Sequence, residues 1–339
     1  MRAGGALALA LVIVLLVPQR PGAGADVISE ISIRSHMGFL ASDALNGRGS
    51  GTRDEWITAT YIASCLRQWG IEPLGDAGDY VQTIETPPRR LTPTGTAATT
   101  DAPAAPGHTW NAIGQLTGKT PAASSDVILL TAHLDHLGVR GTGLDTIFNG
   151  ADDDASGTTA VLELAEALAR GPRPKRTVIF AWFGSEEAGG YGARDFLDHP
   201  PVPLERVAAN LEFEMIGRPD PKVPPHTLWL TGYERTNLGS ELAKHGARIV
   251  ADPHPEQNFF SRSDNIQLAR RGVVAQTVSS FGLHADYHKP SDEISTIDFA
   301  HMAEAIRSML APVRWLANSK FTPEWLPGMK PAALAGRGL

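Results

Sequence analysis

The chain has 339 residues, of which 42% are hydrophobic and 20% are charged, and this composition is typical of a soluble globular protein. The formal net charge of −7 offers little basic surface to a phosphate backbone, so we expect no nucleic-acid partner. The only cysteine, Cys65, excludes an internal disulfide. Because Cys65 lies in a helical pattern of apolar residues, it is predicted to be a buried thiol and not a nucleophile.

The first 25 residues have the pattern of a secretory signal peptide. Arg2 precedes an apolar run over residues 6–17, and Ala23, Gly24 and Ala25 form a small-residue cleavage pattern. The run is shorter than the ~20 residues that a bilayer span needs. We therefore expect export to the periplasm or the extracellular space, with no stable membrane association after cleavage. The alternative is an uncleaved N-terminal anchor.

Beyond the signal, apolar runs of strand length alternate with a clear helical pattern. The helix is predicted over residues 156–170, where Val161, Leu164, Ala165 and Leu168 recur at the spacing of one helix face. The runs are mostly unbroken, as in strands that are buried on both faces. They cover residues 126–132, 177–183, 207–216 and 272–279.

This alternation predicts a single globular α/β domain, in which a mixed, largely parallel central sheet carries helices on both faces. We expect the domain to cover residues 26–320, and residues 321–339, which are rich in proline and glycine, to form a peripheral tail. Residues 86–125 are rich in Pro, Thr, Ala and Gly. There we expect loops and an edge strand around residues 110–116.

Residues of the types that bind metals follow these runs, at the points where strands are expected to give way to loops. In such folds the carboxyl ends of the strands are where ligands bind. The residues supply two imidazoles and at least three carboxylates, which is a ligand set for two close zinc ions and a spare acid for catalysis. They are His133 and Asp135 in TAHLDHLG, Asp153 in GADDDASG, Glu186 and Glu187 in FGSEEAGG, Glu214 in NLEFEMIG, and His288 in YHKPSDE.

The order of these motifs resembles that of the M28 family of di-zinc aminopeptidases. An HxD motif, a GxDDxxSG turn, an EE pair, a Glu in an LxFEMIG strand and an HKPSD segment follow one another as in that family. Residues 39–76 also resemble the family's N-terminal segment, so the match runs from about residue 39 to residue 309. Any one motif is weak evidence, whereas five in the right order are specific.

The resemblance implies the zinc-peptidase fold, two zinc ions and a peptide substrate with a free N-terminus. It implies that Glu186 is the general base for a hydroxide that bridges the metals, and that Asp135 fixes the ring of His133 by accepting its second N–H. It also implies a cis peptide bond after the bridging aspartate. The implied ligands are His133, Asp153 and Glu214 for one zinc, and Asp153, Glu187 and His288 for the other.

Two of the motifs leave alternatives open. Local chemistry does not choose the bridge among Asp152, Asp153 and Asp154, and only the family's spacing to the following Ser-Gly selects Asp153. Asp135 could instead bind metal itself. His136, beside it, is expected to be an ordinary packed or hydrogen-bonded histidine.

The last two ligand positions also carry alternatives. The family mostly has Asp where this chain has Glu214, and Glu212, on the same face of the strand, is the fallback ligand. The segment FGLHADYHKPSDE offers both His284 and His288. The family pattern of an aromatic residue followed by histidine selects His288, and Asp292 then orients its second nitrogen or shapes the loop.

Other functions on the same fold remain alternatives to an aminopeptidase. A carboxypeptidase or dipeptidase would need a cation for the substrate carboxylate, for which Arg262 and Lys289 are the candidates. A single-zinc transferase similar to glutaminyl cyclases would not need the full bridge. A non-catalytic binding relative would be expected to have lost ligands.

Overall fold

The structure is a computed structural model that describes residues 28–90, 104–120 and 126–333. The predicted signal peptide, residues 1–25, lies outside the described residues. Across the described ranges no helix combines the length and the apolar character that a membrane span requires.

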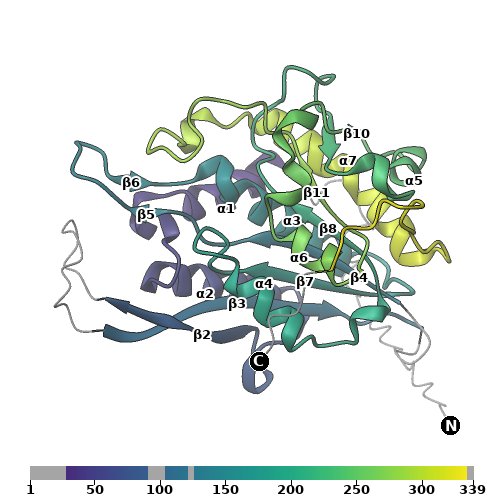
Figure 1. The fold of residues 1–339 in the computed structure, drawn as a ribbon, viewed down its shortest axis with the longest axis horizontal. Helices are drawn as coiled ribbons and strands as arrows, with labels where there is room; N and C mark the ends of the chain where they lie inside the picture. The colour runs from purple at the N-terminus through teal and green to yellow at the C-terminus, as the bar shows by residue number, and fades with distance from the viewer. Residues whose placement is uncertain (1–27, 91–103, 121–125, 334–339) are drawn as a thin grey trace, which may run out of the picture.

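The centre of the fold is one mixed sheet of nine strands (Figure 1). Its path runs β1-β3-β7-β4-β8-β11-β9-β10, and β2 pairs with β3 beside that path. The pairs β7–β4, β4–β8, β8–β11 and β9–β10 are parallel, whereas β3 runs antiparallel to β7. The strands are β1 (Glu72–Pro73), β2 (Val81–Arg90), β3 (Ala104–Leu116), β4 (Val127–His133), β7 (Thr177–Phe183), β8 (Val207–Phe213), β9 (Leu228–Leu230), β10 (Ile249–Ala251) and β11 (Ala275–Ser279). A separate two-stranded sheet joins β5 (Gly138–Val139) and β6 (Ile147–Phe148).

The central strands β4, β7, β8 and β11 are buried at every position, and most of their residues are apolar. In β4, Ile128 and Leu130 belong to one hydrophobic core, whereas Val127 and Leu129 belong to another on the opposite face. Side chains alternate between the faces of a strand, so an unbroken apolar run fits only a strand covered on both sides.

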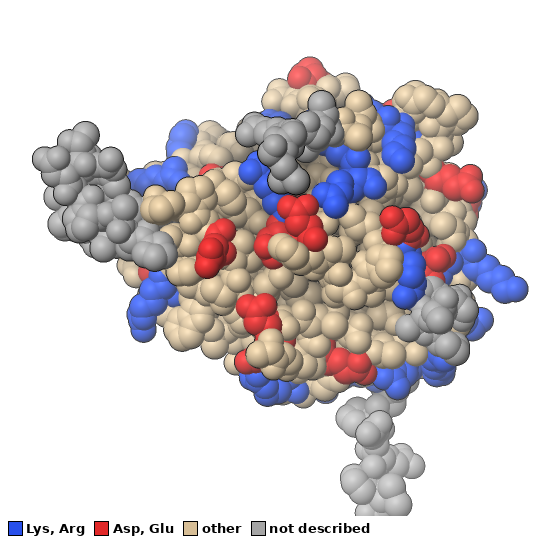
Figure 2. Space-filling view, turned by 60° about the horizontal axis from the view of Figure 1, so that its bottom comes forward, with Lys and Arg blue, Asp and Glu red and all other residues tan. Residues whose placement is uncertain are grey.

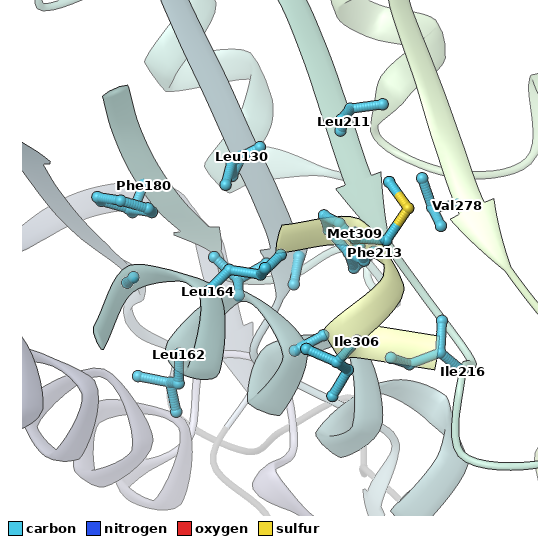
Figure 3. Close-up of a cluster of buried hydrophobic side chains, with 14 of the residues drawn as sticks. Leu130, Leu162, Leu164, Phe180, Leu211, Phe213, Ile216, Val278, Ile306 and Met309 are labelled. Atoms are coloured by element: carbon cyan, nitrogen blue, oxygen red, sulfur yellow. The ribbon is translucent and has the colours of Figure 1, made fainter. Parts of the chain in front are cut away.

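Helices cover both faces of the sheet (Figure 1). The larger core lies under α1 (Glu30–Leu40), α2 (Arg53–Gln68), α3 (Gly157–Arg170) and α7 (Phe299–Asn318), and α5 (Leu238–Lys244) packs beside α7. The opposite core lies under α4 (Tyr191–Asp198) and α6 (Asn265–Arg270). In Figure 3, Leu164 of α3 and Ile306 and Met309 of α7 gather around Phe213 at the end of β8.

The predicted fold class is confirmed, and most of the predicted elements are found. Strands β4, β7, β8 and β11 fall within or next to the predicted runs, and α3 falls within the predicted helix. Cys65 is buried, at 8% exposure. The prediction of an edge strand around residues 110–116 is wrong. These residues belong to β3, which pairs with β7 on one side. Its other side is covered by β1 and β2, which precede it in the chain and pair with it antiparallel in the same sheet.

The described part of the C-terminal segment, residues 321–333, returns to the body of the domain. Phe321 stacks on Trp315 of α7 with ring centroids 5.4 Å apart, and Trp325 packs edge-on against Phe260. The boundary between domain and tail at residue 320 stays a prediction.

A carboxylate is buried where α1, α2 and α3 meet. The Glu163 side chain of α3 has no exposed surface, and its Oε1 lies 3.8 Å from Nε2 of His36. Nδ1 of His36 forms a hydrogen bond with the Tyr61 hydroxyl at 2.8 Å. Burial raises the pKa of Glu163 to about 7 and lowers the pKa of His36 to about 4. The carboxylate form of Glu163 is thus disfavoured in the folded protein.

We predict that Glu163→Gln makes the protein more stable than the wild type at pH 8 but not at pH 4. The folded-state pKa of Glu163 lies above the ordinary glutamate value of 4.5, so the contribution of Glu163 to stability is full below pH 4.5 and is lost as pH rises toward 7. The difference in unfolding free energy should change by about 3 kcal/mol over this window. Urea unfolding at a series of pH values measures it. Glu166→Gln, one turn along α3 in the ion pair with Arg170, is the control. Unfolding free energies of the wild type and Glu163→Gln that change in parallel with pH would contradict the prediction.

Candidate metal centre

The carboxyl ends of three neighbouring parallel strands bring the sequence motifs together. His133 ends β4 and lies opposite Phe183, the last residue of β7. On the other side β4 pairs in parallel with β8, which ends at Phe213. Glu186 and Glu187 follow β7, and Glu214 follows β8, so their backbones emerge at the same edge of the sheet.

Asp153 lies between two histidines and presents a different oxygen to each. Its Oδ1 is 3.2 Å from Nε2 of His133, and its Oδ2 is 3.1 Å from Nε2 of His288. Asp153 is 2% exposed, so this arrangement is fixed inside the protein. The peptide bond that follows it, Asp153–Asp154, is cis, as the resemblance implied.

Two carboxylates complete a group of possible ligands on each side of Asp153. Donor atoms of His133, Asp153 and Glu214 lie within 4.8 Å of one another. On the other side, Oε1 of Glu187 is 3.2 Å from Nε2 of His288. Nε2 of His133 and Oε1 of Glu187 are buried without a hydrogen-bond partner, which is costly unless another group satisfies them. Imidazole nitrogen and carboxylate oxygen are ligands that zinc takes, so the residues fit this ion.

The other two aspartates of the turn have different partners. Asp154 accepts hydrogen bonds from the backbone N–H groups of His133 and Met215, at 3.3 and 3.1 Å, and so ties the end of β4 to the end of β8. Asp152 accepts the N–H of Gly217 at 2.8 Å and pairs with Nε2 of His284 at 2.9 Å. Of the three aspartates, only Asp153 faces both His133 and His288 in the described contacts.

The turn that contains Asp153 is held by a residue near the end of the chain. The Asp292 carboxylate accepts the backbone N–H groups of Asp152 and Asp153 at 3.0–3.1 Å. Of the two roles expected for Asp292, the contacts show the shaping of this loop. Arg48, which sequence analysis missed, is buried nearby and donates to the carbonyl groups of Leu134, Asn149 and Gly150. Its position in an early segment, far from the motifs, gave no local signal.

The turn after β7 is positioned by buried acceptors. Asp135 Oδ1 accepts the N–H of Glu186 at 3.0 Å, and Glu55 Oε1 accepts the N–H of Ser185 at 2.9 Å. The predicted contact between Asp135 and His133 is looser than expected. Nδ1 of His133 is 3.7 Å from Oδ1 of Asp135 but 3.2 Å from the Asp135 backbone oxygen, which is therefore the nearer acceptor.

The remaining sequence candidates have distinct places. Glu212, the fallback ligand, accepts the N–H of Asn265 at 2.6 Å. His284 pairs with Asp152, as described above. His136, which was expected to be an ordinary packed histidine, has its Nδ1 only 3.0 Å from Oε1 of Glu187. A histidine three residues after His133 has no distinctive spacing, so no pattern in the sequence marks this contact.

The electrostatics of the site reflect crowded carboxyl groups in a buried place. Burial and nearby acids raise the pKa of Glu214 to about 7 and that of Glu186 well above its usual value. Burial also opposes the charge of Asp153, but His133 and His288 outweigh it and hold its pKa well below the usual range. A divalent cation would supply the positive charge that protons otherwise provide to these groups.

Residues 111–313 match peptidase family M28. The chain belongs to this family. It is 37% identical to leupeptin-inactivating enzyme 1 of Streptomyces exfoliatus over 87 residues, which are 24% of this chain and 20% of the relative. It is 26% identical to leucine aminopeptidase 1 of Trichophyton rubrum over 211 residues, 58% of this chain and 56% of the relative. The chain thus spans between a fifth and just over half of these two relatives.

The fold of this M28 protein is shared with solved structures. A zinc aminopeptidase from Bacillus subtilis matches with a TM-score of 0.66 at 17% identity, over 87% of this chain and 97% of that one. The mixed sheet covered by helices on both faces is therefore the fold of known zinc aminopeptidases.

Proposed function

We propose that the protein is an exported aminopeptidase that uses two zinc ions to remove residues from the N-terminus of peptides. The observation that carries the proposal is Asp153, whose two carboxylate oxygens face His133 and His288 separately. A carboxylate in this position can bridge two close cations. Family membership and the zinc aminopeptidase fold support the same function. The proposed ligands are His133, Asp153 and Glu214 on one side, and Asp153, Glu187 and His288 on the other.

Glu186 is the proposed proton carrier. Zinc, when bound, is a Lewis acid that lowers the pKa of water and polarises a carbonyl group. Glu186 lies next to the proposed ligand Glu187, on a turn whose N–H is accepted by Asp135. Burial raises its pKa, which suits a group that takes up a proton and returns it. It would take the proton of the attacking water and deliver it to the leaving amine.

The pocket beside Glu214 suits an apolar first residue of the substrate. Trp229 and Phe259 stack there with centroids 5.3 Å apart. The pocket wall is mixed, and its aromatic part favours an apolar side chain, while the carboxylate of Glu214 in the same wall suits the substrate's free α-amine. The apolar and aromatic residues that line the pocket are Met215, Trp229, Phe259, Phe281 and Tyr287.

A carboxypeptidase or dipeptidase is the second candidate because a cation lines the same pocket. Arg262 belongs to the pocket wall, and its guanidinium lies 5.0 Å from the centroid of the Phe259 ring. An arginine there could receive a substrate carboxylate. Lys289, the other candidate, is exposed on the loop that carries His288.

Export and the choice of partners are further parts of the proposal. Export is supported by the signal-like composition of residues 1–25 and implies a substrate outside the cytoplasm. A nucleic-acid partner is not proposed, since the net charge is −7 and Figure 2 shows acidic and basic side chains interspersed on the face in view.

We predict that the protein hydrolyses aminoacyl amides with a free α-amine and prefers leucyl or phenylalanyl amides over aspartyl amides. Removal of metal by a chelator should abolish this activity, and addition of zinc should restore it. The apolar pocket and the proposed ligands are the reason. Hydrolysis rates on a panel of chromogenic amides, with N-acetylated and C-amidated peptides as matched controls, measure the substrate requirement and the metal dependence. Activity that requires a free carboxylate would favour the second candidate, whereas full activity in a metal-free preparation would contradict both. Release of cyclised N-terminal glutamine would indicate a transferase.

We predict that Glu186→Gln lowers kcat by about 10²–10⁴-fold and leaves the zinc content unchanged, since it removes a proton carrier and no ligand. Glu187→Gln, at the adjacent position, should instead lose zinc. Turnover assays and elemental analysis of both variants measure the two effects. Loss of zinc in Glu186→Gln alone would mean that the roles of the two glutamates are exchanged.

We predict that Asp153→Asn loses at least one zinc, because two cations about 3.5 Å apart would no longer share an anion and would repel each other strongly. Asp152→Asn, the matched variant in the same turn, should keep both ions, since Asp152 is engaged by His284 and Gly217. Elemental analysis counts the metal in each. The assignment of Asp153 as the bridging ligand is wrong if Asp152→Asn loses metal and Asp153→Asn keeps both ions.

A further inference from the structure

We infer that His136 is an additional ligand of the metal centre, so that the ion between Asp153 and Glu187 is bound by two imidazoles. This inference rests on the proposed zinc site and adds one donor atom to it, Nδ1 of His136. The consequence is a site whose two metal positions differ in how many protein ligands they have.

The distances place His136 on the same side of Asp153 as His288. Nδ1 of His136 is 3.0 Å from Oε1 of Glu187 and 3.9 Å from Oδ2 of Asp153. Nε2 of His288 is 3.2 and 3.1 Å from the same two oxygens. Ligand atoms at zinc bond lengths of about 2.0–2.1 Å in a tetrahedron are separated by about 3.3 Å. Nε2 of His288 thus has the expected spacing to both oxygens, and Nδ1 of His136 has it to Glu187. The longer distance from His136 to Asp153 still lies within the 4.8 Å that encloses donor atoms of His136, Asp153 and Glu187.

His136 does not make the hydrogen bond that its distance to Glu187 would allow. Its Nδ1 and Oε1 of Glu187 both lack a hydrogen-bond partner although they are 3.0 Å apart, so the ring nitrogen is not directed at that oxygen. Nε2 of His133, a proposed ligand on the other side of Asp153, is in the same condition. Buried polar atoms without a partner are rare in proteins. A cation on the Glu187 side would satisfy Nδ1 of His136 and Oε1 of Glu187, and a second cation on the Glu214 side would satisfy Nε2 of His133.

The backbone around His136 fixes the ring in this place. The N–H of His136 donates to the carbonyl of Arg48 at 3.1 Å, and its own carbonyl accepts the N–H of Ser50 at 3.3 Å. The ring lies against Gly150, where a Cβ atom would be 2.5 Å from Cγ and Cδ2 of the imidazole. Gly150 also has a φ of +55°, so glycine is favoured there for two reasons. His136 itself is fully buried.

An additional imidazole makes the two positions unequal. The position beside Glu187 would have His136, His288, Asp153 and Glu187, whereas the position beside Glu214 has three protein ligands. Zinc with four protein ligands is typical of closed sites, and zinc with three keeps a place for water or substrate. We therefore expect the substrate to be received on the Glu214 side, next to the apolar pocket, and the ion on the Glu187 side to be the more tightly held.

The rival explanation is that His136 only positions Glu187 through an ion pair. Zinc X-ray absorption of the full chain loaded with two zinc ions distinguishes them, because imidazoles are counted directly. Three histidines over two ions give about 1.5 imidazoles per zinc, and two give about 1.0. We expect about 1.5 in the wild type and about 1.0 in His136→Gln. His284→Gln is the matched control and should keep the wild-type count, since His284 contacts Asp152 instead.

Chelator competition gives a second readout that does not depend on activity. His136→Gln should weaken the more tightly bound zinc by more than the 10–100-fold that loss of a supporting residue costs, with the other zinc little affected. A wild-type count of about 1.0 with two zinc ions bound overturns the inference and leaves the proposed zinc site intact. The inference is also overturned if His136→Gln binds zinc less tightly but keeps the wild-type number of imidazoles per zinc. A wild type that binds no zinc overturns the proposed function itself. The wild-type count decides even if the variant fails to fold.

Discussion

The orientation of one carboxylate is the constraint on which the site depends. Asp153 must offer its two oxygens to opposite sides at once, so the turn that carries it must be held in place. The surrounding contacts hold it. Asp292 accepts N–H groups of the turn, Asp154 joins it to the ends of β4 and β8, and Arg48 donates to the carbonyl groups of Asn149 and Gly150 just before it. Arg48 and Asp292 come from parts of the sequence far from the turn and meet it only in the folded chain.

The same contacts place several acids in a region where charge is costly. Burial raises the pKa of Glu212 to about 8 and that of Asp264 to about 7, beside Glu214 and Glu186, whose pKa values are also raised. Acids crowded in this way repel one another unless protons or cations intervene. Metal binding at the proposed site would therefore be coupled to folding, because a divalent cation would relieve a repulsion that the fold itself creates.

The sequence predicts the parts of this molecule that depend on local pattern. Unbroken apolar runs predicted β4 and β7, because a strand buried on both faces is apolar along most of its length. Helical spacing predicted α3, because the buried face of a helix repeats every three to four residues. The interior position of β3 could not be predicted, since strand partners are set by tertiary pairing. The proximity of His136 to Glu187 was likewise hidden, because it arises from a loop packed against Gly150.

Glu214 shows how a residue can depart from a family pattern without abolishing the site. Its N–H still donates to the carbonyl of Val278 at 3.1 Å, so the backbone continues the pairing between β8 and β11. The extra methylene relative to aspartate is therefore taken up by the side chain, whose carboxylate still comes within 4.8 Å of donor atoms of His133 and Asp153. A longer side chain carries the carboxylate farther from the strand end, toward the pocket lined by Trp229 and Phe281. Its effect should thus fall on the placement of the substrate's amine and first side chain more than on the availability of a ligand.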